Sequence, residues 1–157
     1  MSIVQHTGNL FDTRDRVIIH GCNDAGGFGS GVAGQIAKLF PEARTAYLDA
    51  WRAGQAGPGR VIWAKSGDYR IANTITQRGY GREEGKVYAD YEAIAEAFRK
   101  INRAALMSRV DERVQIWFGG SVESLSMPRI GAGLAGGDWD RILDLAEQAF
   151  SDVQVNI

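Results

Sequence analysis

The chain has 157 residues, of which 45% are hydrophobic and 24% charged, so it suits one domain over residues 1–157 with a sizeable core. Its 18 basic and 19 acidic side chains give a formal net charge of -1, which argues against bulk nucleic-acid binding. A lone cysteine, an amino terminus unlike a signal peptide and only short apolar runs predict a cytoplasmic protein with no membrane association.

Short β-branched runs and amphipathic segments alternate in the first half of the chain. Apolar residues at helical spacing predict helix over 31–53. Pro41 lacks an N–H and disfavours helix at the residue before it, so this segment should divide into two helices. Strands are predicted over 2–5, 16–20, 60–64 and 69–76, with a turn at Gly67 and Asp68 joining the last two.

The second half continues the alternation. An amphipathic helix is predicted over 91–107, and a second helix over 139–150 with Asp138 as its N-cap. Further strands are predicted over 114–118, 124–128 and 153–157. The whole pattern predicts an α/β fold in which a mixed β-sheet is sandwiched between helices. In such folds, ligands bind beyond the carboxyl ends of the strands.

Two glycine-rich loops each follow an apolar strand and precede a helix, over 23–31 and 131–137. Glycine permits positive φ and a close approach of the backbone to a ligand. The free N–H groups at the start of the following helix attract anions. The two loops therefore predict two phosphate-binding cradles, although one such loop alone is as often a packing device.

Other ligand sites are disfavoured by residue counts and spacing. Gly27, Gly29 and Gly31 do not have the Gly-x-Gly-x-x-Gly spacing of a dinucleotide fold, which argues against a nicotinamide-dependent oxidoreductase. Two histidines and one cysteine argue against a zinc site, and the sequence predicts neither a metal nor a cofactor.

Polar residues at the end of the strand over 16–20 are candidates for chemistry. His20 beside the first cradle is interpreted as a catalytic acid or base, with a purely hydrogen-bonded role as the alternative. Asn23 and Asp24 are candidates for contacts to sugar hydroxyls or a water, or are turn formers. Cys22 is interpreted as a small buried residue.

These segments resemble the macrodomain family along nearly the whole chain. The resemblance lies in the motifs at 8–11, 17–23, 28–33, 71–77 and 127–139. They look most like the branch that includes ADP-ribose 1''-phosphate phosphatases, phage and bacterial relatives, and terminal ADP-ribose glycohydrolases. The family fold, a mixed sheet between helices, agrees with the pattern of elements above.

The resemblance implies a binding site for ADP-ribose. The Gly8-Asn9-Leu10 turn would hold the adenine, with Asn9 where an acidic residue is usual, and Asn23 and Asp24 would face the distal ribose. Backbone groups of both loops would bracket the diphosphate. The implied ligand contacts are Asn9, Leu10, Asn23, Gly29, Ser30, Gly31, Val32, Gly131, Ala132, Gly133, Leu134, Ala135 and Gly136.

The resemblance also implies a choice of chemistry. The lysine and aspartate of the glycohydrolase branch correspond to Gln77 and Ala135, whereas the His-x-Cys-Asn pattern of the phosphatase branch is present, with His20 and Asp24 as expected catalytic residues. The expected activity is hydrolysis of ADP-ribose 1''-phosphate, or of an ADP-ribosyl or O-acetyl ester. The alternative is a non-catalytic reader of ADP-ribose or of ADP-ribosylated macromolecules.

Overall fold

A single mixed sheet forms the centre of the protein. The computed structural model describes residues 2–29, 31–81, 83, 85–133 and 135–157. The strands are β1 (Ser2–Val4), β2 (Val17–Asn23), β3 (Val61–Ser66), β4 (Tyr69–Gln77), β5 (Ser124–Ser126) and β6 (Gln154–Asn156). They lie in the order β1-β6-β5-β2-β4-β3, and only the β3–β4 pair of this sheet is antiparallel. The predicted mixed α/β sheet is therefore confirmed.

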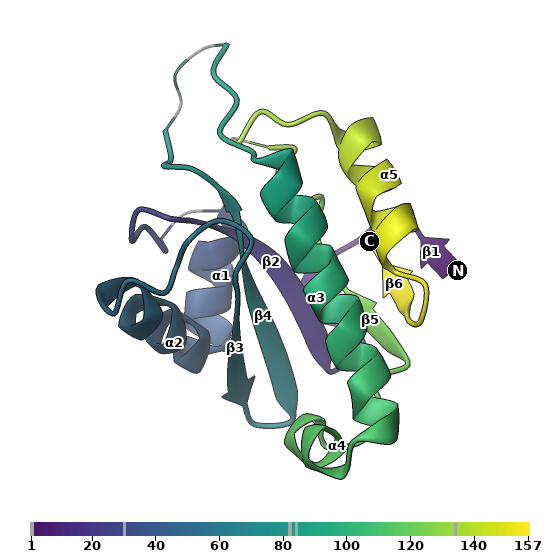
Figure 1. The fold of residues 1–157 in the computed structure, drawn as a ribbon. Coiled ribbons are helices and arrows are strands. Elements are labelled where there is room, and N and C mark those ends of the chain that lie inside the picture. The colour runs from purple at the N-terminus through teal and green to yellow at the C-terminus, as the bar shows by residue number, and fades with distance from the viewer. Residues whose placement is uncertain (1, 30, 82, 84, 134) are drawn as a thin grey trace.

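Helices cover both faces of the sheet (Figure 1). They are α1 (Gly31–Leu39), α2 (Pro41–Arg52), α3 (Tyr91–Val110), α4 (Glu112–Phe118) and α5 (Trp139–Ala149). Ile18 of β2 packs in the core beneath α1 and α2, whereas its neighbour Ile19 packs in the core beneath α3 and α5. Successive side chains of a strand face opposite sides, so one strand supplies both cores. Pro41 begins α2, as predicted.

The long loops gather at one end of the sheet (Figure 1). Strands β2, β4 and β5 are parallel neighbours, so their carboxyl ends meet at the same edge. Strand β2 continues to Asn23, three residues beyond the predicted end, because it pairs with β4 as far as Gln77. Asn23 thus belongs to the strand end. Within the described part of the chain, no helix combines the length and apolarity needed to cross a bilayer.

The strand predicted over 114–118 is wrong, because these residues form most of helix α4. The Asp111 side chain caps the first turn, accepting hydrogen bonds from the N–H groups of Arg113 and Val114 at 2.9 and 3.2 Å. Gly119, with φ of 73°, ends the helix in the left-handed conformation that favours glycine. These two caps stabilise a helix over an apolar run whose composition alone is typical of a strand.

Replacing Asp111 with Ala should therefore lower the free energy of unfolding by about 1 kcal/mol, the usual contribution of an N-cap side chain. Urea denaturation followed by circular dichroism measures this loss. Asp111→Asn is the matched control, because its amide oxygen can still accept the two N–H bonds. Equal losses in the two variants would show that charge, rather than capping, is what Asp111 supplies.

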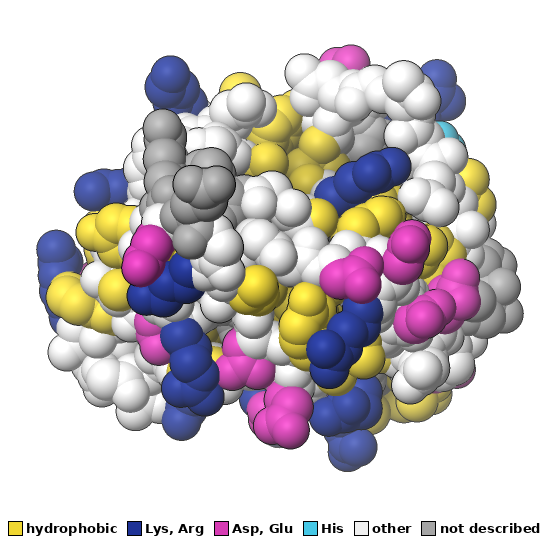
Figure 2. Space-filling view, turned by 90° about the horizontal axis from the view of Figure 1, so that it is seen from above, with side chains coloured by type: hydrophobic (Ala, Val, Ile, Leu, Met, Phe, Trp, Pro, Cys, Tyr) yellow, Lys and Arg dark blue, Asp and Glu magenta, His cyan; other side chains and the backbone are white. Residues whose placement is uncertain are grey.

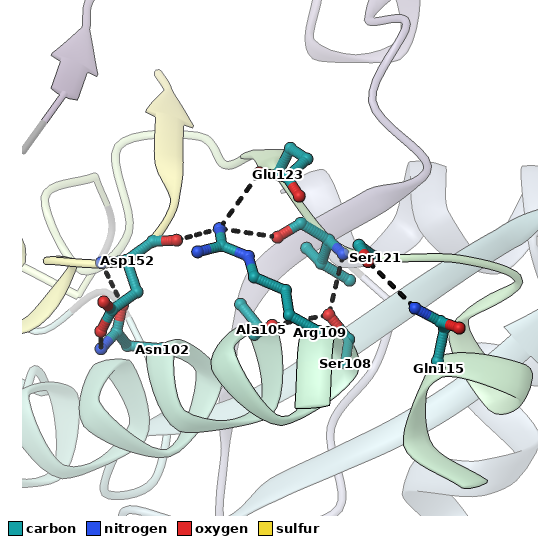
Figure 3. A network of polar contacts seen from close by, with 9 residues as sticks. Asn102, Ala105, Ser108, Arg109, Gln115, Ser121, Glu123 and Asp152 are labelled. Carbon is teal, nitrogen blue, oxygen red and sulfur yellow. Dashed lines mark hydrogen bonds and ion pairs between the residues drawn. The ribbon is translucent and has the colours of Figure 1, made fainter. Parts of the chain in front are cut away.

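Polar contacts around Arg109 fasten the opposite end of the sheet (Figure 3). The Arg109 guanidinium donates to the carbonyls of Val122, at 3.2 Å, and Asp152, and pairs with Glu123 at 3.4 Å. Asn102 exchanges hydrogen bonds of 3.0 Å with both the side chain and the backbone N–H of Asp152. These contacts join the carboxyl half of α3 to the segments that enter β5 and β6. The glycine-rich loops lie at the other end of the sheet.

Candidate functional site

A groove of about 570 Å³ lies at the carboxyl ends of β2, β4 and β5, between the two glycine-rich loops. The structure brings together the two loops that the sequence singled out, although 99 residues, 32–130, separate them. The first loop, the β2 end and the segment after β4 contribute Gly21, Cys22, Asn23, Gly27, Phe28, Gly29, Gly31, Val32, Ala33, Gln77, Tyr80 and Gly81. The segment after β5 and the second loop contribute Pro128, Arg129, Ile130, Gly131, Gly133 and Ala135.

A second hollow of about 630 Å³ adjoins this groove, and Pro128 and Arg129 line both. Asn9, Leu10 and the carboxyl end of β6 line its other walls. Because they share these two residues, the two spaces are neighbours, and we refer to them together as the elongated cleft. Figure 2 views this end from above and shows acidic and basic side chains interspersed over the face, so neither sign of charge dominates it.

The glycines of the first loop have two different roles. Gly26, with φ of +84°, and Gly27 are packing positions, since an added Cβ would lie 2.9 Å from the Trp51 ring and 3.0 Å from the Tyr80 ring, respectively. At Gly29 and Gly31 an added Cβ would meet no heavy atom within 4 Å. The open side of these two glycines adjoins the groove that they line, which leaves their backbone available to a ligand.

The second loop divides in the same way. Gly136 has φ of +73° and would place a Cβ 2.9 Å from the Lys86 carbonyl, while a Cβ on Gly137 would lie 2.5 Å from the Gly131 carbonyl. A Cβ added at Gly133 would meet no heavy atom within 4 Å, and Gly133 lines the groove. Gly133 is therefore the position in this loop where a side chain would enter the groove without disturbing the fold. Ser30 and Leu134, two of the expected contacts, lie outside the described residues.

The amide oxygen of Asn9 is used in a hydrogen bond within its own turn. Its Oδ1 accepts a hydrogen bond from the Phe11 N–H at 2.9 Å and so caps a 3₁₀ turn over Leu10–Asp12. Because an N–H must be met by the amide oxygen, this contact fixes the orientation of the amide. The Nδ2 donors of Asn9 remain for a ligand in the second hollow, where the carboxylate usual in the family would offer a further acceptor.

His20 lies behind the groove rather than in its wall. Its side chain is fully buried on the sheet face covered by α1 and α2, with its ring edge-on to Phe28 at a centroid distance of 5.3 Å. Its Nε2 is 2.5 Å from Oδ1 of Asn73, whose Nδ2 donates to the Ala43 carbonyl at 3.1 Å. This placement favours the alternative interpretation of His20 as a hydrogen-bonded structural residue. A direct role at the distal ribose stays an untested prediction.

The surroundings of His20 keep its imidazole neutral. Burial lowers the pKa of His20 to about 4, and the bond to Asn73 opposes this shift. Since Asn73 uses its Nδ2 as a donor to Ala43, its Oδ1 must accept from His20, which assigns the imidazole proton to Nε2. Cys22, with its sulfur 3.7 Å from the same ring, is buried as predicted, and burial raises the pKa of its thiol.

Asn23 and Asp24 organise the first loop. The Asn23 side chain donates to the Gly27 carbonyl at 2.8 Å and accepts from the Gly27 N–H at 3.1 Å, closing the loop on itself. Oδ1 of Asp24 accepts from the Gly79 N–H at 2.7 Å and so links the loop to the segment after β4. Asn23 lines the groove, whereas Asp24 is half-buried and is not among the described residues that line it.

Arg129 is the only charged side chain among the described residues that line the groove. Tyr80, 63% exposed, stands at its edge. Sequence reasoning did not single out either residue for function. Arg129 lies between β5, which ends at Ser126, and the second loop, a position that marks it as a neighbour of that loop, but Tyr80 lies in a segment without any distinctive pattern. The described residues contain no cluster of three or more His, Cys, Asp or Glu side chains placed to hold a metal ion.

The fold and this site define an α/β domain with a groove between two glycine-rich loops, beyond the carboxyl ends of its parallel strands. Residues 19–146 match the family model described as "Macro domain", and the chain belongs to that family.

Several characterised proteins are similar to this chain. An ADP-ribose 1''-phosphate phosphatase of Candida glabrata is 29% identical over 150 residues, which span 84% of each protein. A DNA ADP-ribosyl glycohydrolase of Thermus aquaticus is 24% identical over 94% of this chain and 37% of the relative. The structure of Thermosipho africanus DarTG in complex with ADP-ribose has a TM-score of 0.76 at 18% identity, covering 99% of this chain and 41% of that one. The last comparison supports the fold alone.

Proposed function

We propose that this protein binds ADP-ribose in the elongated cleft. The observation that carries the proposal is that the groove and the second hollow share Pro128 and Arg129 in their walls, with the open glycines Gly29, Gly31 and Gly133 along the groove. In this assignment the adenosine occupies the hollow beside Asn9 and Leu10. The diphosphate lies against the open backbone of both loops, and the distal ribose faces Asn23.

We further propose that the protein hydrolyses an ADP-ribose derivative, with ADP-ribose 1''-phosphate as the first candidate. In that reaction water attacks the terminal phosphorus, the bond from phosphorus to the distal ribose oxygen breaks, and ADP-ribose and inorganic phosphate are released. The Candida glabrata relative supports this class of substrate. An ADP-ribosyl or O-acetyl ester is the next candidate, and the Thermus aquaticus relative supports the ADP-ribosyl form.

A reader of ADP-ribosylated macromolecules is the second candidate function. The observation that favours it is the chemistry of the groove wall, in which the described residues offer Arg129 as the only charged group and no carboxylate or imidazole. General acid–base catalysis requires a titratable group within hydrogen-bond reach of the reacting atoms. Besides Arg129, the described lining of the groove offers only Tyr80 and the buried Cys22 as titratable groups, which favours binding without turnover.

Two measurements on the purified protein test these proposals. Isothermal titration calorimetry with ADP-ribose should give micromolar-class affinity, with weaker binding of AMP and none of NAD. Release of inorganic phosphate from ADP-ribose 1''-phosphate should then exceed the uncatalysed rate. Binding without phosphate release would favour the reader, and no heat with saturating ADP-ribose would overturn the binding proposal itself.

Asp24 is the residue at which catalysis and loop structure can be separated. Asp24→Asn should lower phosphate release by about 100-fold, the usual contribution of a positioned general base, while ADP-ribose binding persists. The amide oxygen of the new side chain can still accept the Gly79 N–H bond of 2.7 Å. Asp24→Ala, which removes that bond, should lose both turnover and affinity. A fully active Asp24→Asn protein would assign Asp24 to loop structure only.

A further inference from the structure

A second groove, of about 440 Å³, lies at the opposite end of the molecule from the glycine-rich loops, where α4 meets α3 and the edge strand β3 (Figure 1). We call it the α3–α4 groove. Its floor is made of apolar side chains and its rim of cations. The floor consists of Trp63, Ala104, Met107, Val114, Trp117 and Phe118, and the rim of Lys100, Arg103 and Arg113.

Exposed apolar side chains lie on α3 and α4, the two helices that form this groove, and Trp117 among them lines it. Among the described residues, nine large hydrophobic side chains are exposed, and four of them lie within 106–117. They are Leu106 at 40%, Val110 at 73%, Ile116 at 70% and Trp117 at 37%. Single exposed apolar residues are common on protein surfaces and need no explanation. A cluster of them with a polar rim is typical of a site for protein interaction.

The charge of the groove has one sign. Among the described residues, three cations and no carboxylate line it, on a chain whose formal net charge is -1. Lys100 is engaged, pairing with Glu96 at 3.1 Å and donating to the Gly59 carbonyl at 2.9 Å. The side chains of Arg103 and Arg113 are exposed, and among the described residues their guanidinium groups have no hydrogen-bond or ion-pair partner. Two guanidinium groups beside an apolar floor are complementary to carboxylates that flank a bulky apolar side chain.

We propose that the α3–α4 groove binds an acidic peptide segment that carries a bulky apolar side chain. The apolar side chain would occupy the floor beside Met107 and Trp117, and the carboxylates on either side of it would pair with Arg103 and Arg113. The proposal is independent of ADP-ribose binding, because no residue of this groove lines the cleft at the carboxyl ends of the strands.

The aromatic geometry favours a peptide over a nucleic-acid strand. Bases bind single-strand sites by stacking flat on exposed rings. Here Trp63 and Trp117 meet at 76°, and Trp117 and Phe118 at 87°, so each ring presents an edge to its neighbour. The Arg70 guanidinium lies over the Trp117 ring, 5.4 Å from its centroid, and covers one of its faces. The groove therefore accepts a side chain into its floor more readily than it offers a stacking platform.

The experiment uses fluorescence anisotropy of a labelled eight-residue peptide in which one leucine and one phenylalanine are separated by glutamates. At low salt this peptide should bind, and the same peptide with lysines in place of the glutamates should not. The double variant Arg103→Glu with Arg113→Glu should weaken binding by about ten-fold or more, because rim charges set affinity at low ionic strength. Arg44→Glu with Arg52→Glu on α2 is the matched control, with the same change in net charge.

Each result decides the proposal. Binding of the acidic peptide that is lost in the groove variant and kept in the α2 variant supports it. ADP-ribose titration of both variants verifies that they are folded. Equal loss in both variants would show general electrostatic attraction and overturn the site. Absence of binding to the native protein, or binding only of a labelled poly-thymidine oligonucleotide, would overturn the proposed class of partner.

Discussion

Gly133→Val is expected to abolish ADP-ribose binding while leaving the protein folded. A Cβ at Gly133 meets no heavy atom within 4 Å, and no positive φ strains a larger residue there. The valine side chain would therefore enter the groove itself and occupy the space assigned to the diphosphate. We expect calorimetry to show a loss of at least about 100-fold in affinity, which corresponds to about 3 kcal/mol.

The control for this experiment is Gly57→Val. Gly57 also has open space at its Cβ position and no positive φ, but it lies outside both parts of the cleft. The affinity of Gly57→Val for ADP-ribose should match that of the native protein. Thermal denaturation should show that Gly57→Val and Gly133→Val are both folded. Gly31→Glu is a less clean test, because φ of +58° at Gly31 adds backbone strain to any side chain. Native affinity in Gly133→Val would show that the second loop does not contact the ligand.

Acidification should destabilise the native fold through His20 by about 3 kcal/mol between pH 6.5 and pH 4. Burial lowers the pKa of His20 from 6.5 to about 4, and each pKa unit corresponds to about 1.4 kcal/mol. Above pH 6.5 His20 is neutral in both the folded and the unfolded chain, so its contribution is fully present. Below that pH only the unfolded chain gains the proton, which lowers the free energy of unfolding until the folded pKa is reached.

Urea denaturation at a series of pH values measures this effect. In His20→Gln, whose amide can still donate to Asn73, the slope between pH 6.5 and pH 4 should be smaller than in the native protein. Asp15 adds a loss in the same direction below about pH 5, because hydrogen bonds from Ser124 and Ser126 outweigh burial and lower its pKa, but this loss is common to the native protein and His20→Gln. Phosphate release by the same variant at neutral pH tests the predicted catalytic role of His20. A native protein with constant stability across the window would contradict the buried, neutral imidazole.

Local sequence patterns predicted the α/β class and most of the elements. The division at Pro41, the strand pair joined at Gly67 and the N-cap at Asp138 all rest on contacts within a few residues, which a pattern can express. The segment over 114–118 failed because strand and helix are equally compatible with a short apolar run. The deciding features were Asp111 and Gly119 on either side of it, and both are visible in the sequence as capping residues.

Patterns were less informative about the site. The two loops were found from their glycines, but composition cannot distinguish Gly133, with open space around it, from Gly137, which packs against a backbone carbonyl. The sequence did indicate that His20 is buried, because it lies on the same strand face as Ile18 and Cys22, and both of these are apolar. Its partner Asn73 lies on another strand, and that pairing depends on the register of the sheet.

The position of β6 between β1 and β5 has a consequence for how the chain is made. Among the described residues, β1 pairs only with β6, so β1 has no neighbour in the sheet until β6 has been synthesised. The β2–β4–β3 half depends on contacts closer in sequence and can assemble earlier. Nascent chains should therefore hold a partly formed sheet, with the β5 edge exposed, until translation passes residue 156. Protease digestion of chains stalled before and after that residue would reveal the transition.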